Sequence, residues 1–235
     1  MMQVIEPKYF MLNCKFIATG LSYEDYLLEI LNWSWFFRNK SQDRSEYKAP
    51  QSQDNGESDA YSSEYQIDFK MLVDEEVMCA LSKNRPTVNK KHINEGIIIV
   101  NDNLNQSPVP SKNILADLMS ITLDEIKGNT FSSKTAEHFI KNIGKAKNLF
   151  LYYPYEYVGD TGCFVNAFAN MLTKIFSIPL SYRKQQYPDK DTFVCIKVNK
   201  YFLIFEWGDN GFVYRDRVNE LLCSVYMDYK LYSFF

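Results

Sequence analysis

Residues 65–70 carry the pattern that most constrains how this chain can fold. Every second side chain is large and apolar (tyrosine, isoleucine, phenylalanine), and the positions between them hold glutamine, aspartate and lysine. A period of two predicts a β-strand with one buried face. On the polar face, Asp68 and Lys70 stand side by side between bulky neighbours.

Asp59 lies upstream of this strand, across a short turn that we expect at Ser62 and Ser63. If the turn closes a hairpin, Asp59 and Asp68 converge on one cation, with Lys70 beside it. Carboxylate oxygens are the ligands of hard divalent ions. Such an ion polarises a phosphate and activates water, and a lysine can orient or deprotonate that water. Asp54 is an alternative to Asp59 as the first acid.

These residues resemble the active-site hairpin of the PD-(D/E)XK nuclease superfamily. Asp59 matches the first acid, Asp68 the D/E position and Lys70 the lysine, whereas Ser58 stands where the family name has proline. The resemblance implies that Asp59 and Asp68 hold Mg²⁺ or Mn²⁺, and that Lys70 positions the attacking water. We expect Gln66, on the same face, to contact that water or the substrate.

A helix before the hairpin often supplies a further acid to the metal site in this superfamily. A serine N-cap and acidic residues in the first turn predict a helix from Ser22 through Phe37. Glu29 lies on this helix and is the candidate for the additional acid, by resemblance. A solvent-facing position for Glu29 is an open alternative.

The order of predicted elements indicates an α/β (α+β) fold with a mixed central sheet flanked by helices. Residues 1–158 read as a restriction-endonuclease-like core with a polar, mobile loop at 38–58. The core contains a helix opening at 74, a buried strand at 96–100, helices at 114–126 and 132–143, and a strand from 148. Residues 159–235 read as an extension: a helix ending before Pro179, a basic loop at 183–186, then an antiparallel meander whose fourth strand begins at Leu221.

Charge limits the mode of nucleic-acid binding. The net charge is −3 and the pI is about 5.5, which excludes a uniformly basic binder but allows a local basic patch. The basic residues nearest the hairpin in sequence are the candidates for phosphate binding. They are Lys83, Arg85, Lys90 and Lys91.

The five cysteines are scattered, and we interpret them as free thiols in a reducing cytoplasm. Cys163 would begin a helix, the position of the nucleophile in papain-like proteases. Those enzymes take their base from a later strand, whereas His92 and His138 both precede Cys163. No apolar run is long enough to span a bilayer, so we expect no membrane partner.

The sequence therefore predicts a Mg²⁺- or Mn²⁺-dependent endonuclease that hydrolyses nucleic acid, most simply DNA. By resemblance it would serve in restriction, repair or antiviral (phage) defence. The alternative is a non-catalytic protein-binding or assembly subunit with a degenerate nuclease-like fold. In that case the aromatic C-terminal third would bind a protein partner or a second copy of the chain.

Overall fold

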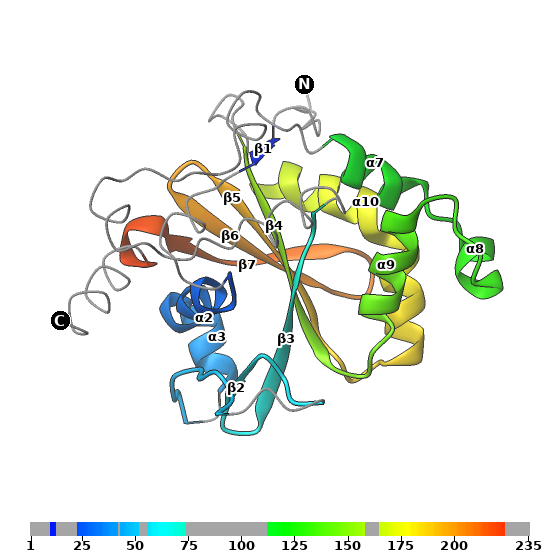
Figure 1. The fold of residues 1–235 in the computed structure, drawn as a ribbon. Coiled ribbons are helices and arrows are strands. Elements are labelled where there is room, and N and C mark those ends of the chain that lie inside the picture. The colour runs from blue at the N-terminus through cyan, green and yellow to red at the C-terminus, as the bar shows by residue number, and fades with distance from the viewer. Residues whose placement is uncertain are drawn as a thin grey trace, which may run out of the picture.

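In the computed structural model, residues 10–12, 23–41, 43–51, 56–73, 112–157 and 165–223 are described. They form a mixed α/β fold in which a twisted central sheet is covered by helices on both faces (Figure 1). This confirms the predicted class of fold.

Among the described residues the sheet has seven strands, in the order β2-β3-β4-β5-β6-β7 with β1 paired to β4 off this path. β3, β4 and β5 are mutually parallel, and the other pairs are antiparallel. The predicted meander is therefore present, but it continues the same sheet through the β4–β5 pair. The strands are β1 (Phe10–Leu12), β2 (Ala60–Ser62), β3 (Tyr65–Met71), β4 (Asn148–Tyr157), β5 (Thr192–Val198), β6 (Tyr201–Trp207) and β7 (Phe212–Asn219).

Helices cover the two faces unequally. The first two described helices lie on one face, and the other four described helices lie on the opposite face (Figure 1). The helices are α2 (Tyr23–Trp33), α3 (Trp35–Lys40), α7 (Lys112–Ser120), α8 (Leu123–Gly128), α9 (Lys134–Ile143) and α10 (Val165–Gln186). None of the helices within the described residues is long and apolar enough to cross a membrane.

Alternation along the central strands divides the core in two. Leu149 and Leu151 of β4 pack with α7, α9 and α10, whereas Phe150 and Tyr152 pack with α2 and α3. The same alternation holds in β3, where Ile67 and Phe69 pack on the α2–α3 side. The predicted strand at 65–70 and its buried apolar face are thus confirmed, and the polar face turns toward α9.

α10 contradicts the predicted helix end. It runs through Pro179, and its buried face continues with Phe176, Leu180 and Arg183. A proline removes one helical hydrogen bond, but the apolar contacts on both sides of it keep the helix on the sheet. The predicted basic loop at 183–186 is therefore wrong, and Arg183 is a buried helical residue.

The first predicted helix divides at Ser34, which caps α3 and donates from its hydroxyl to Asp216 Oδ2 at 2.7 Å. The loop that follows was predicted to be mobile, but Tyr47 within it is 1% exposed and its backbone N–H donates to Asn32. Lys48 pairs with Tyr61 of β2. In its described part, this loop is therefore attached to the core.

Further differences lie at element ends. The helix predicted at 114–126 is two helices, because Thr122 caps α8 through a capping box with Glu125. Residues 220–223 are helical, so the fourth meander strand does not begin at Leu221. The predicted helix at 74 and strand at 96–100 lie outside the described residues.

Candidate functional site

The β2–β3 hairpin brings the two candidate acids to one place. β2 and β3 are antiparallel, with Ala60 opposite Ile67 and Ser62 opposite Tyr65. The paired residues end at Ala60, and the carboxylate of Asp59, one residue earlier, accepts a hydrogen bond from the backbone N–H of Phe69, the residue after Asp68. Asp59 and Asp68 are therefore neighbours at the edge of β3. The side chains of Asp68 and Lys70 lie on the face of β3 turned away from Ile67 and toward α9.

The turn of the hairpin differs from the predicted one by a single residue. Ser62 still pairs with Tyr65, so the two turn residues are Ser63 and Glu64. Ser63 has a φ of 50°, the left-handed backbone that two-residue hairpin turns use. The observed turn sets Ala60 opposite Ile67, which brings Asp59 to the edge of β3 near Asp68.

Asp59 is held against the edge of β3. Its Oδ2 accepts a hydrogen bond from the backbone N–H of Phe69 at 2.7 Å and lies 3.7 Å from Nζ of Lys70. Lys70 is therefore beside the first acid, as the hairpin hypothesis requires. Both side chains are about a quarter exposed (23% and 24%), so the pair is accessible to a ligand.

Asp68 is the buried member of the site, at 4% exposure. Its Oδ1 lies 3.2 Å from Nζ of Lys147, which also donates to the backbone oxygen of Glu57 at 3.0 Å. A buried carboxylate needs a counter-charge or hydrogen bonds to remain ionised at low cost. Lys147 meets that need and joins the segment before β2 to the start of β4.

Each acid therefore has one lysine partner, and the four charges cancel. None of the hydrogen bonds made by the described residues involves Oδ1 of Asp59 or Oδ2 of Asp68, so each carboxylate keeps an oxygen for another ligand. Mg²⁺ usually keeps several waters and takes only one or two protein carboxylates, with substrate phosphate completing its shell. Asp59 and Asp68 fit that minimal donor set.

A fuller protein cage is not seen. No group of three or more histidine, cysteine, aspartate or glutamate side chains able to hold a metal occurs among the residues that the structure describes. Any ion at the hairpin would therefore depend on water and substrate oxygens for its remaining ligands.

Arg183 fixes the turn that carries Lys147. It is 3% exposed, and its guanidinium donates to the backbone oxygens of Ile143 at 2.5 Å, of Lys145 at 2.7 Å and of Lys147. Its Nε donates to Oγ1 of Thr192 on β5 at 3.0 Å. Burial lowers the pKa of Arg183 to about 10, so it stays charged at neutral pH. One side chain thus ties α10, the α9–β4 turn and β5 together.

The start of β3 is anchored independently. Tyr65 donates from its hydroxyl to Asp191 Oδ2 at 2.8 Å, and Lys40 lies 2.5 Å from the same oxygen. Burial, and then the charge of Asp191, raise the pKa of Tyr65 well above its ordinary value, so its hydroxyl keeps the proton that it donates. Asn148 donates to the backbone oxygen of Gln66 at 2.8 Å, and the side chain of Gln66 is exposed.

The structure does not bring Glu29 to this hairpin. Glu29 is buried on α2, whose side chains pack on the opposite face of the sheet from Lys70. Its negative charge is among the causes that raise the pKa of Cys223, which follows β7. The alternative of a solvent-facing Glu29 is also wrong.

Other candidates fall outside the described residues, so the structure does not place them. These are the rival acid Asp54, the basic set Lys83, Arg85, Lys90 and Lys91, and the pair Cys163 and His92.

Lys147 is a site residue that sequence reasoning missed. It directly precedes β4, and in the parallel β3–β4 pair Asp68 lies opposite Leu149. The sequence signal for Lys147 was a lysine directly before a predicted strand. That signal points to Asp68 only once β4 is known to pair with β3.

Comparison of the chain with models of protein families, with curated proteins and with solved structures finds no match.

Proposed function

We propose that this protein is a metal-dependent phosphodiesterase of the PD-(D/E)XK type that hydrolyses nucleic acid. The observation that carries the proposal is the contact of Asp59 with the acid-bearing strand. Asp59 Oδ2 accepts from the backbone N–H of Phe69, the residue after Asp68, and lies 3.7 Å from Nζ of Lys70. A restriction-endonuclease-like core, with this hairpin followed by helices and the parallel strand β4, is part of the proposal.

In this proposal each side chain has a separate task. Asp59 and Asp68 would hold Mg²⁺ or Mn²⁺, since each keeps a carboxylate oxygen without a hydrogen bond among the described residues. When bound, the ion supplies polarisation of the phosphate and activation of water. Lys70 orients the attacking water and stabilises charge on the phosphate oxygens. Arg183 acts at a distance, by holding the turn from which Lys147 reaches Asp68.

A second candidate is favoured by one specific observation. Lys70 and Lys147 together neutralise both acids, which is the arrangement expected of a hairpin that keeps its shape without a cation. A non-catalytic binding subunit with a degenerate site would have this closed charge balance. The two candidates differ in whether a divalent ion can displace the lysines from the acids.

Nuclease activity separates them. Wild-type protein is incubated with Mg²⁺ or Mn²⁺ and single-stranded or duplex oligonucleotides of DNA or RNA, beside Asp68→Asn and Lys70→Met. Asp189→Asn and Lys190→Met are the matched controls, because they remove the charges of a solvent-accessible ion pair in the turn between α10 and β5 that contacts neither acid. We expect both site variants to lose about a hundredfold or more in rate, the range of one general acid–base or electrostatic group. Equal cleavage by all variants, or cleavage by none including wild type, contradicts the proposal.

A further inference from the structure

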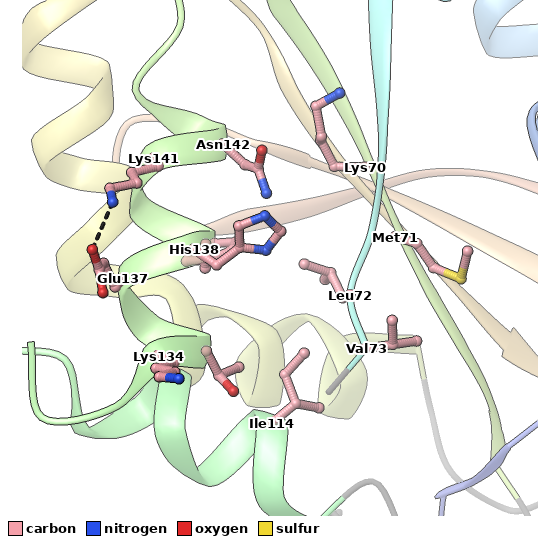
Figure 2. Close-up of a pocket in the computed structure, with 12 residues that line it drawn as sticks. Lys70, Met71, Leu72, Val73, Ile114, Lys134, Glu137, His138, Lys141 and Asn142 are labelled. Carbon is pink, nitrogen blue, oxygen red and sulfur yellow. Dashed lines mark hydrogen bonds and ion pairs between the residues drawn. The ribbon is translucent and has the colours of Figure 1, made fainter. Parts of the chain in front are cut away.

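A cavity of about 340 Å³ lies between the end of β3 and α9. This is within the range of about 300–1,000 Å³ found for small-ligand sites. Figure 2 shows His138 and Asn142 reaching from α9 toward β3, where Lys70 and Leu72 face them. His138 and Asn142 share one face of α9 because they are four residues apart in a helix. Lys70 and Leu72 share one face of β3 because they are two residues apart in a strand.

The cavity has two chemically different parts. Its floor is apolar and buried, formed by Leu72, Ile114 and Phe139. Its rim is polar and carries Lys70, Lys134, His138 and Asn142. Glu137 and Lys141 pair with each other at 2.6 Å on the side of α9 that faces away from β3 (Figure 2). Glu137 and Lys141 also line the cavity but neutralise each other, and Lys70 is shared with Asp59, so Lys134 is the lining cation without an ion-pair partner among the described residues.

Lys70 belongs to both the cavity and the hairpin site. Its Nζ lies 3.7 Å from Asp59, and its side chain lines the cavity. A ligand that fills the cavity therefore has its end at Lys70, beside Asp59. The ammonium of Lys70 makes no hydrogen bond to a described residue, so together with Lys134 it can donate to a negatively charged group at the rim, and the floor favours a flat apolar body.

An unpaired nucleotide has these two parts. Its phosphate matches Lys70 and Asn142 at the rim, and its base matches Leu72 and Ile114, with the imidazole of His138 available for stacking. A base inside a duplex reaches such a cavity only after it is unstacked and unpaired, at an energetic cost. A single strand or a strand end reaches it without that cost.

We propose that the cavity between β3 and α9 binds one unpaired nucleotide, with its phosphate at Lys70 and Asn142 and its base on the apolar floor. The role of this nucleotide site in catalysis rests on the proposed function. The site makes single-stranded nucleic acid, or a frayed end, the preferred substrate. Binding itself requires neither the metal ion nor the carboxylates.

Calorimetric titration of the full chain in a chelating buffer tests the inference without any cleavage. The probes are deoxyadenosine 5′-monophosphate, deoxyadenosine and inorganic phosphate. We expect the monophosphate to bind about tenfold or more tightly than either part alone, the equivalent of about 1.4 kcal/mol. Weaker or equal binding of the monophosphate overturns the inference.

Two variants locate the ligand. Asn142→Asp keeps the shape of the rim but places a carboxylate against the phosphate. It should weaken binding of the monophosphate about tenfold and leave deoxyadenosine unaffected. His138→Ala should weaken both. Asn210→Asp, in the exposed β6–β7 turn, is the matched control and should behave as wild type. Equal affinity of Asn142→Asp and Asn210→Asp for the monophosphate contradicts the assignment.

The two proposals fail separately. Asp68→Asn should bind the monophosphate at least as tightly as wild type, because it removes a negative charge near the phosphate and no group that lines the cavity. Binding with no cleavage of any oligonucleotide removes the proposed function and leaves the nucleotide site. Cleavage with no binding, or faster cleavage of duplex than of single strand, removes the nucleotide site alone.

Discussion

Replacing Arg183 with methionine should destabilise the protein severely. The substitution removes the hydrogen bonds of the guanidinium to the backbone oxygens of Ile143, Lys145 and Lys147 and to the hydroxyl of Thr192. Ile143 and Thr192 are buried, so their abandoned oxygens cost about 1–3 kcal/mol each. Water can reach the exposed turn around Lys145, so those oxygens cost less.

The net loss is smaller than the sum of these costs. The folded protein no longer has to desolvate a guanidinium, and methionine regains part of the apolar contact. We expect a loss of about 3 kcal/mol in the free energy of unfolding, within the range for breaking a buried hydrogen-bond network. For a chain of this size that corresponds to a fall in Tm of about 6–12 °C.

Urea unfolding followed by circular dichroism measures the loss, with Lys184→Met as the matched control. Lys184 is the next residue of α10 and makes one exposed hydrogen bond to Pro188. Its replacement should change stability by less than about 0.5 kcal/mol. An Arg183→Met protein within about 1 kcal/mol of wild type, or an equal loss in Lys184→Met, refutes the role of Arg183 in holding the turn.

Four further predictions concern other residues of the described structure. Lys147→Met should bind Mn²⁺ about tenfold more tightly in a calorimetric titration, because the ion no longer competes with an ammonium for Asp68; unchanged affinity contradicts this. Burial raises the pKa of Cys223 from 9.0 to about 12. The folded protein therefore keeps this proton longer than the unfolded chain, and the stability present below pH 9 is lost as the pH rises toward 12, which urea midpoints across that interval measure. Cys195 and Cys223 should also stay unlabelled by N-ethylmaleimide at about pH 8, as peptide mapping reports, and rapid labelling of the folded protein opposes their burial. Thr122→Ala should cost about 1 kcal/mol, since it removes the N-cap of α8; no shift of the urea midpoint would count against the cap.

Local patterns predicted the central part of the fold well. Period-two alternation located β3, and the predicted antiparallel meander is present as β5, β6 and β7. These signals act over a few residues, so a single sequence contains them. The contact of Asp59 with Lys70 was predictable for the same reason, because a short hairpin returns the chain beside itself.

Tertiary contacts decided what the sequence did not reveal. Pro179 looked like a helix end, yet packing of Phe176 and Leu180 on the sheet outweighs one lost hydrogen bond. Glu29 was predicted to lie on a helix beside the hairpin, but that helix, α2, packs on the other face of the sheet. Lys147 lies 79 positions after Asp68 in the sequence, and only the parallel pairing of β3 with β4 makes the two residues neighbours.

Mn²⁺ binding followed by electron paramagnetic resonance tests the site most directly, with wild type compared with Asp59→Asn, Asp68→Asn and the control Asp189→Asn. If the hairpin holds the cation, wild type and the control bind the ion, and each of the two site variants loses it. Binding that survives both site substitutions, or its absence from wild type, contradicts a metal site shared by Asp59 and Asp68.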